Sequence, residues 1–508
     1  MLCIGLALVG NLGNVDQVVV NLKSRTAISP YIYGANFPNW EKMGSVYTVA
    51  RQGGNRMTAY NWETNASNAG NDYRHQNDGY MGESTEPGWT LRTFFQPAQS
   101  HGAAVILTVP AAGYVSADKY PSGDVNLTPD YLNKRFFKSF ATKPGGKYEF
   151  PPNTADKAVY QDEMVAWVEK TKSSKTPVWY SVDNEPDLWH STHERIVPKN
   201  MGFEKFLAVS IDFAKAIKNV APKSWVFGPA SYGWNGFRTF QDAPDRNGRD
   251  FLDFYLAEMK KAESKAGKRI LDVLDIHWYP EARGGGKRIT EVGNEETELA
   301  RIQAPRSLWD PTYVEESWIS DTLGKKPITL IPRTQQQIAK NYPGTKLGIT
   351  EYNFGGDKTP GGLVAQADVL GIYGRYGVTV ACNWGISAEA PAQMAAFQSF
   401  LNFDGKGSKF GSVGLGVSGV NNEKSSVYAA VDANNSKRLT LIYVNKDTVS
   451  QTTSISIPGF AAKSVRAFEA NISNPFAPKT ASLAKIAAAG VQLTNVPARS
   501  VITIELKS

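Results

Sequence analysis

The sequence contains very little cysteine, with only Cys3 and Cys382 among 508 residues. Cys382 lies in an apolar, strand-like run and Cys3 in the apolar stretch at the start of the chain, so we expect no disulfide between them. No Cys-x-x-Cys or paired Cys/His spacing is present, which excludes the common zinc motifs. No apolar run is long enough to cross a membrane, so we predict no membrane partner.

Charge of one sign is not concentrated anywhere either. The net charge is +7 and the sequence pI is about 9.0, but the lysines and arginines are scattered along the chain. A nucleic-acid-binding protein needs a basic stripe or a known binding module, and neither is present, so we predict no nucleic-acid partner. The sequence also has no Gly-x-Ser-x-Gly motif, no P-loop and no Gly-x-Gly-x-x-Gly that opens a helix, which argues against serine hydrolases and nucleotide enzymes.

Eight apolar segments of strand length alternate with helical patterns in the first four fifths of the chain. The predicted strands are 31–38, 55–62, 102–110, 177–184, 224–230, 273–280, 347–353 and 378–385, and the main predicted helices are 89–100, 156–172, 201–219, 250–264, 333–341 and 362–376. Continuous apolar strands that alternate with helices indicate a parallel sheet, and eight of them predict a TIM-like (β/α)₈ barrel. An open doubly wound sheet is disfavoured because no glycine-rich phosphate turn follows its first strand.

The pattern changes after about Gly405. Short β-branched segments, separated by Asn, Asp, Gly and Pro, predict an appended antiparallel β-sandwich. We therefore expect four parts: 1–14 as a leader or partial signal remnant, 15–30 as N-terminal strands that join the sandwich, 31–404 as the catalytic barrel, and 405–508 as the β-sandwich domain.

Two glutamates end predicted barrel strands. Glu185 closes the run from Pro177 to Pro186, and Glu351 closes the run that begins at Leu347. The C-terminal ends of parallel barrel strands share one mouth, where barrel enzymes carry their catalytic groups. Hydrolysis of a glycosidic bond needs one carboxylic acid to protonate the leaving oxygen and one carboxylate to attack or to activate water. The pair predicts a glycoside hydrolase that needs no cofactor for catalysis.

Several motifs resemble glycoside hydrolase family 44. They are Tyr33 to Asn36, Arg51 to Gly70, Tyr180 to Pro186, Asp275 to Tyr279, Ile349 to Asn353, and Asp404 to Phe410 with the stretch from Val427 to Asn445. The resemblance covers nearly the whole chain from about residue 15, and the block 51–70 is its most specific part. It implies a TIM-like barrel with an appended sandwich and a secreted, retaining endo-β-1,4-glucanase, with Glu185 as the general acid/base and Glu351 as the nucleophile.

The substrate that the resemblance implies is a β-glucan polysaccharide, such as a cellulose derivative or xyloglucan, and we expect the protein to be a monomer. Two other readings stay open. One is a xylanase or mannanase on the same scaffold. The other is a catalytically silent carbohydrate-binding protein, against which the presence of both glutamates argues.

Three further residues at predicted strand ends are candidates for substrate binding. Asn184 is placed to hydrogen-bond a sugar hydroxyl beside the reacting carbon, although a turn residue before proline would look similar. Tyr279 can hold the nucleophile through its hydroxyl, or serve as a buried structural tyrosine. Trp384 suits a stacking floor, because the C–H face of a pyranose packs on an indole plane, and core packing is the alternative.

Four more residues complete the predicted substrate site. Trp62 and Trp189 follow predicted strands and are candidates for the cleft or for the core. His277 stands two residues before Tyr279 on the same predicted strand. Arg56 is predicted inside a strand, where a buried arginine needs a carboxylate partner, and a catalytic carboxylate is one candidate.

Glu63, Asp156, Asp162 and Glu163 are candidate ligands of a structural calcium ion. Hard cations prefer several oxygen ligands, and these residues precede or open elements that can meet. No EF-hand spacing is present, so isolated solvated acids, or acids at a helix N-terminus, explain them about as well.

Overall fold

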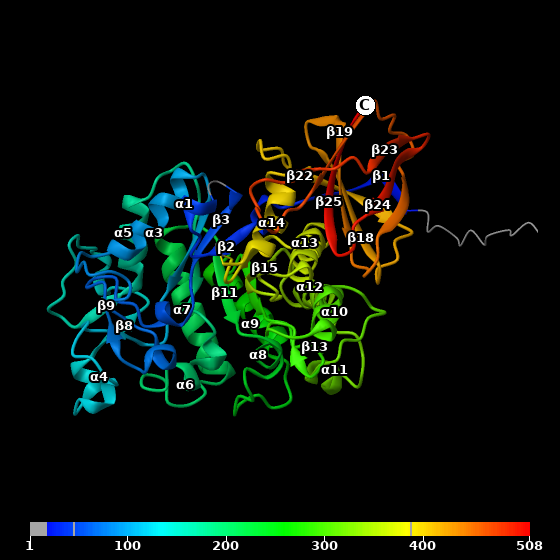
Figure 1. Cartoon of the computed structure of the whole chain (residues 1–508). Coiled ribbons are helices and arrows are strands. Elements are labelled where there is room, and N and C mark those ends of the chain that lie inside the picture. Colours follow the sequence, from blue (N-terminus) through cyan, green and yellow to red (C-terminus); the bar gives the residue numbers. More distant parts are fainter. Residues whose placement is uncertain (1–17, 44–45, 387–388) are drawn as a thin grey trace, which may run out of the picture. The chain divides into compact units, whose positions relative to one another are not determined.

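The computed structural model describes residues 18–43, 46–386 and 389–508 (Figure 1). It divides into two compact units. One consists of Ser29–Asp357 and Ile372–Ala390, and the other of Lys358–Gly371, Pro391–Ser508 and the described residues up to Ile28. The predicted leader, 1–14, lies outside the described residues. Within the described residues, no helix combines the length and apolarity needed to cross a membrane.

Eight strands close into a barrel in the first unit. In chain order they are β2 (Gly34–Asn36), β3 (Val49–Gln52), β6 (Ala104–Val109), β10 (Val178–Val182), β11 (Val226–Ser231), β12 (Val273–Trp278), β15 (Lys346–Tyr352) and β16 (Val380–Asn383). Each strand is parallel to the next, and β16 pairs with β2 to close the ring. The predicted TIM-like barrel is confirmed.

Helices follow most of the barrel strands. The long ones are α3 (Trp89–Ser100), α5 (Gln161–Thr171), α7 (Phe203–Val220), α9 (Phe251–Ala266), α12 (Leu330–Asn341) and α13 (Pro360–Arg375), close to the six predicted helices. Their apolar faces turn inward; α7, for example, buries Phe206, Phe213 and Ile217. Figure 1 shows α7, α9 and α12 flanking the barrel strands.

The second barrel strand lies at a different place from the predicted one. The prediction of a strand at 55–62 is wrong, because β3 ends at Gln52 and the short helix α2 occupies Asn55–Thr58. Gly54, with φ of 82°, turns the chain from the strand into the helix. Met57, in α2, and Tyr60, just after it, are fully buried, so their apolar character reflects packing outside the sheet.

The barrel interior is filled by side chains from most of its strands. Val49, Ile106, Phe227 and Val273 belong to one buried cluster, which also contains Trp179. The Trp179 ring stacks on Trp225, with centroids 4.5 Å apart. Because the interior is packed, ligand-binding groups must lie at the barrel mouth.

Insertions after three strands build that mouth. They are β4 (Ser67–Asn68), the turn η3 (Gly70–Tyr73) and β5 (Asn77–Asp78) after β3; β7 (Tyr114–Ser116), β8 (Phe136–Phe140) and β9 (Ala158–Tyr160) after β6; and β13 (Arg283–Gly284), β14 (Lys287–Arg288), α10 (Glu295–Gln303) and α11 (Trp318–Thr322) after β12. All of them follow the C-terminal ends of barrel strands.

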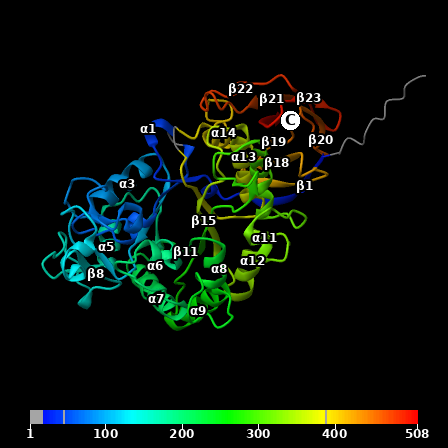
Figure 2. The same ribbon diagram turned by 60° about the horizontal axis from the view of Figure 1, so that its bottom comes forward.

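The second unit is built on a ten-stranded sheet. Its strands are β1 (Val18–Ala27), β17 (Val413–Ser418), β18 (Ser425–Asp432), β19 (Asn435–Asn445), β20 (Gln451–Ser456), β21 (Ser464–Glu469), β22 (Lys479–Thr480), β23 (Ala484–Ala487), β24 (Gly490–Val496) and β25 (Ser500–Lys507). In both views β1, in blue, lies among the orange and red C-terminal strands (Figures 1 and 2), antiparallel to β17 and parallel to β20. One core draws residues from both halves of the sheet, so the sheet curls around it as in the predicted sandwich.

Two helical segments belong to this second unit. Helix α14 (Pro391–Leu401) and the first part of α13 group with the sheet. Thr503 of β25 donates a hydrogen bond to the carbonyl oxygen of Ser399, at 2.9 Å. A side chain at Gly371 would collide with the Tyr428 ring, so the glycine allows the helix to approach the sheet closely.

Candidate active site

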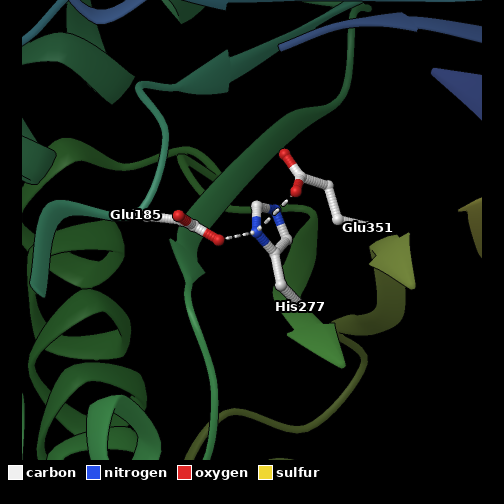
Figure 3. A group of neighbouring side chains, drawn as sticks. All are labelled: Glu185, His277 and Glu351. Carbon is white, nitrogen blue, oxygen red and sulfur yellow. Dashed lines mark hydrogen bonds and ion pairs between the residues drawn. The ribbon is translucent and has the colours of Figure 1, made fainter. Parts of the chain in front are cut away.

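Three side chains from three barrel strands converge at the mouth (Figure 3). The imidazole of His277, from β12, lies between the carboxylates of Glu185 and Glu351. Glu185 comes shortly after β10, and Glu351 is part of β15. His277 Nδ1 is 2.8 Å from Glu185 Oε1 and 3.6 Å from Glu351 Oε2. One ligand atom from each of the three residues lies within 4.8 Å of the others, so the two carboxyl groups are near neighbours.

Tight backbone geometry presents Glu185. Asp183 and Glu185 adopt positive φ angles of 59° and 42°, which residues other than glycine rarely adopt. The Glu185 N–H donates to the carbonyl oxygen of Ala230 at 3.0 Å, and the Asp183 carboxylate accepts the hydroxyl of Thr58 at 2.6 Å. Strand β11 and helix α2 thus hold a conformation that is costly by itself.

Glu351 is held by two donors. Arg51 Nη1, from β3, donates to Glu351 Oε1 at 2.7 Å, and the Tyr279 hydroxyl donates to Oε2 at 2.9 Å. Arg51 is completely buried, and it also donates to the side-chain oxygens of Asn36, at 3.0 Å, and Asn184, at 2.9 Å. Hydrogen bonds to both oxygens, one of them from a cation, fix the orientation of the Glu351 side chain.

Asn184 is oriented by the same arginine. Its side-chain oxygen accepts hydrogen bonds from Arg51 and from the N–H of Gly54, the latter at 3.1 Å. The amide nitrogen therefore points the other way, where it makes a long 3.5 Å contact with Asn55 Oδ1. Its two N–H donors are suited to a ligand hydroxyl.

Burial shifts the pKa values of Glu185 and His277 in opposite directions. It raises the pKa of Glu185 to about 7, against the opposing effect of Arg51. Burial also lowers the pKa of His277 to about 4, so the imidazole is neutral near neutral pH. Arg51 Nη2, which can only donate, lies 3.4 Å from His277 Nε2, so we place the imidazole proton on Nδ1, facing Glu185.

The Trp384 ring lies against Gly54, the residue whose N–H donates to Asn184. A side-chain carbon at Gly54 would stand 2.7 Å from the Trp384 ring, and Trp384 is only partly buried. The edge of the exposed Phe37 ring meets Trp384, with centroids 6.1 Å apart. Trp384 and Phe37 therefore offer aromatic surface beside Gly54, at the C-terminal ends of the barrel strands.

The prediction that two tryptophans line the substrate cleft is wrong. Trp62 and Trp189 are 0% and 1% exposed, so neither can offer a ring face to a ligand. The Trp189 indole N–H donates to the Asn184 carbonyl oxygen at 2.9 Å, while Trp62 packs near Trp167. Trp189 thus helps to hold the backbone of Asn184, and Trp62 is part of the core.

The prediction for Arg56 is also wrong. Arg56 lies in helix α2, outside the sheet, and its partner is Asp78, at 2.6 Å, not a catalytic carboxylate. Arg51 is the buried arginine that contacts a glutamate, and the sequence interpretation missed it. The available signal was the run Val49–Gln52, a short apolar strand with an arginine just before a Gly-Gly turn.

The four predicted metal ligands do not converge on one point. Within the described chain, the one group of His, Cys, Asp or Glu close enough to share an ion is Glu185, His277 and Glu351. Asp162 accepts the backbone N–H of Lys143 at 3.0 Å and the hydroxyl of Tyr148 at 3.1 Å, so its carboxylate already has partners within the protein. Glu163 binds the ammonium group of Lys143 at 2.6 Å.

Glu63 nevertheless lies in an unusual setting. Burial, followed by the charges of Asp156 and Glu163, raises its pKa to about 8. Its Oε2 atom is buried and has no hydrogen-bond partner among the described residues. An unpaired carboxylate oxygen close to two other acids is compatible with an oxygen-liganded cation.

Comparison with known proteins gives consistent matches. The profile of glycoside hydrolase family 44 matches residues 66–282. Endoglucanase A of Paenibacillus lautus is 42% identical over 453 residues, which are 84% of this chain and 63% of that protein. Beta-mannanase/endoglucanase A of Caldicellulosiruptor saccharolyticus is 40% identical over 466 residues, 85% of this chain and 34% of that protein. The chain thus spans less than two thirds of these curated relatives.

Solved structures match over nearly the full length. The structure of a Paenibacillus polymyxa xyloglucanase of the same family, determined with xyloglucan, has a TM-score of 0.90 and 35% sequence identity. The match covers 97% of this chain and 99% of the other. Both units described above are therefore present in that relative.

Proposed function

Because the chain belongs to glycoside hydrolase family 44, we propose that it cleaves internal β-1,4 linkages of glucans such as xyloglucan and cellulose derivatives, with retention of anomeric configuration. The observation that carries the proposal is the close pair of carboxyl groups, with oxygens of Glu185 and Glu351 within 4.8 Å of each other. Retaining enzymes keep their carboxyl groups about 5–5.5 Å apart, whereas inverting enzymes need about 6.5–9.5 Å to admit a water molecule.

Glu351 is the proposed nucleophile. Its two oxygens accept hydrogen bonds from the guanidinium of Arg51 and the hydroxyl of Tyr279, so the carboxylate is fixed in direction before the substrate arrives. Attack on the anomeric carbon forms a bond from a Glu351 oxygen to the sugar and releases the leaving-group oxygen. Water then hydrolyses this glycosyl-enzyme ester.

Glu185 is the proposed general acid and, in the second half of the reaction, the general base. A carboxyl with a pKa of about 7 holds a proton in an appreciable fraction of molecules near neutral pH. The Nδ1–H of His277 occupies Oε1, which leaves Oε2 to carry the acidic proton. His277 is thus a positioning residue, not the substrate ligand that the sequence predicted.

The proposed binding of the reacting sugar uses Asn184 and Trp384. The Asn184 amide donors are directed by Arg51 and Gly54, and the Trp384 ring lies against Gly54. A hydroxyl beside the anomeric carbon can accept from Asn184 while the apolar face of the ring packs on the indole.

Two variants and one spectrum test the assignment. Glu351→Ala is expected to lose hydrolysis of xyloglucan, and added azide should restore turnover as the α-glycosyl azide. Glu185→Ala should retain attack on an aryl glycoside with a good leaving group and give the β-glycosyl azide. Proton NMR of the wild-type digest should show the β anomer first. An α anomer first, or full activity in Glu351→Ala, would refute the mechanism.

A second candidate substrate is mannan, because the Caldicellulosiruptor saccharolyticus relative is named as a mannanase as well as an endoglucanase. Only a panel of xyloglucan, cellulose derivatives, xylan and mannan separates these polymers, since the two glutamates serve all of them. Tight binding to a polymer without any rise in reducing ends would instead indicate a silent carbohydrate-binding protein. Polymers of this size do not enter cells, so we infer that the protein acts outside the cell.

For a structural cation we propose Glu63, Asp156 and Glu163 as ligands, whose oxygens a bound ion would draw together from the separate positions described above. The unpartnered Oε2 of Glu63 and the raised pKa of its carboxyl fit a site that a divalent ion neutralises. Calcium there would tie the loop after β3 to the start of α5. The ion would have no part in bond cleavage, because a pair of carboxyl groups is sufficient for it.

A further inference from the structure

We propose that Tyr73 and Tyr80 form an aromatic platform on which a backbone sugar of the β-glucan stacks, away from the cleaved bond. The inference rests on the proposed function, since it locates a further part of the same substrate chain. It concerns the loop after β3, which contains η3, β5 and helix α2.

Both rings are accessible. Tyr80 is 78% exposed and Tyr73 is 44% exposed. A tyrosine ring offers an apolar face to the C–H groups of a pyranose and a hydroxyl to its rim, at a low cost in side-chain entropy. Single exposed aromatic residues are common on protein surfaces, so exposure alone assigns no role.

A shared arginine distinguishes this pair. The guanidinium carbon of Arg56 lies 4.1 Å from the centre of the Tyr80 ring and 5.5 Å from the centre of the Tyr73 ring. Arg56 is itself anchored by Asp78 at 2.6 Å, and Asp78 also accepts the backbone N–H of Tyr80 at 3.0 Å. Cation–π contacts with an anchored arginine order both rings before a ligand binds, which reduces the entropic cost of binding.

The platform is also tied to the reacting centre. The N–H of Gly54 binds Asn184, and Arg56 follows only two residues later, so their Cα atoms lie within about 8 Å. On the other side, Asn55 Nδ2 donates to Asp72 at 3.0 Å, and Asp72 directly precedes Tyr73. The rings therefore lie within reach of an oligosaccharide whose reacting sugar is bound at Asn184.

The structure gives the Tyr73 loop little freedom to move away. A side-chain carbon at Gly70 would stand 1.9 Å from the carbonyl oxygen of Thr192, so the glycine permits close backbone contact at the start of η3. The backbone N–H of Gly70 also donates to Asn68 Oδ1 at 2.8 Å. Tyr73 is thus displayed from a well-packed turn.

Binding measured without turnover tests the platform. In a Glu185→Gln parent, which resembles the protonated acid in shape, calorimetry would compare cellotriose with cellohexaose and a xyloglucan heptasaccharide. Tyr80→Ala and Tyr73→Ala should each weaken binding of the longer sugars roughly fivefold to tenfold and leave cellotriose unchanged. Tyr80→Phe should bind like the parent, because stacking needs the ring and not the hydroxyl.

Tyr376→Ala is the matched control. Tyr376 is a half-buried tyrosine between α13 and β16, at the barrel end opposite the glutamates, so sugar affinity should not change. The proposal would be overturned if the parent, Tyr73→Ala and Tyr80→Ala bound the long sugars with equal affinity. It would also be overturned if the parent did not bind the long sugars at all. Tyr80-dependent binding by a protein that cleaves no polymer would refute the proposed function while supporting the platform.

Discussion

The Nδ1 atom of His277 lies 2.8 Å from Oε1 of Glu185, inside a site where the imidazole is completely buried. Because Nε2 faces the guanidinium of Arg51, the proton on Nδ1 points at Glu185. One neutral donor thus contacts the proposed acid, and its strength helps to determine the pH at which that acid loses its proton.

The first prediction concerns the pH dependence of the wild-type enzyme. The pKa of Glu185 is about 7, so the protonated form needed for leaving-group departure is present below that pH and is lost above it. A plot of kcat/KM against pH for a polymer should therefore fall on the alkaline side from about pH 7. An aryl glycoside with a good leaving group needs less acid assistance and should show a weaker decline. A polymer profile that stays flat to pH 9 would contradict this assignment.

The second prediction concerns His277→Ala. Its N–H stabilises the ionised form of Glu185, so removing it should raise the pKa of Glu185 and move the alkaline limb to higher pH. Loss of positioning should also lower kcat by about 100-fold. His277→Asn keeps an N–H near the position of Nδ1, so its limb should stay closer to that of the wild type. An alkaline limb that moves down in His277→Ala would mean that Glu185 donates to the imidazole.

The barrel and the glutamate pair were predictable because each rests on a strong local signal. Strand β10 is a fully buried run that Asn-Glu-Pro follows after one residue, and Glu351 lies near the end of a similar run in β15. Their meeting follows from strand order alone, since parallel strands in a closed barrel end at one mouth.

The sequence pattern did not identify which arginine is buried beside a proposed catalytic glutamate. Arg51 and Arg56 are five positions apart, and placing the strand over 55–62 assigned the buried role to the wrong one. Composition gives no means of telling the buried rings of Trp62 and Trp189 from the partly exposed ring of Trp384, because all three follow barrel strands. The loops determine which acidic side chains come close together, and the sequence spacing does not predict their conformation. The hydrogen bond from Tyr148 to Asp162 is one example.

The third prediction concerns Arg51→Lys. Lysine keeps the positive charge but cannot donate at once to Glu351, Asn36 and Asn184, as the guanidinium does. We expect kcat/KM to fall by about 100- to 1000-fold, as when a fixed donor to a reacting group is lost. Arg51→Met should in addition lower the melting temperature strongly, because it leaves Glu351 buried without its cation. Near wild-type activity in Arg51→Lys would show that charge alone is sufficient.

The fourth prediction separates the Tyr279 hydroxyl from its ring. Tyr279→Phe removes the donor to Glu351 Oε2 and leaves the packing in place. A hydrogen bond to a charged group is worth about 1.5–3 kcal/mol, so kcat should fall roughly tenfold to a hundredfold. Tyr373→Phe is the control, since the buried Tyr373 hydroxyl has no hydrogen-bond partner among the described residues. Equal rates for the two variants would exclude a role for the Tyr279 hydroxyl.

The fifth prediction tests the cation proposed at Glu63, Asp156 and Glu163. If calcium neutralises the three acids, a chelator should lower the melting temperature by several degrees, and added calcium should restore it. Glu63→Gln should abolish that response, because it removes the one buried carboxylate of the group that has an unpartnered oxygen. Asp162→Asn should keep the response, since its carboxylate is engaged by Lys143 and Tyr148. If neither chelator nor calcium changes the melting temperature of the wild-type protein, the cation proposal is wrong. Lys143, whose ammonium lies 2.6 Å from Glu163, would then be the group that neutralises these acids.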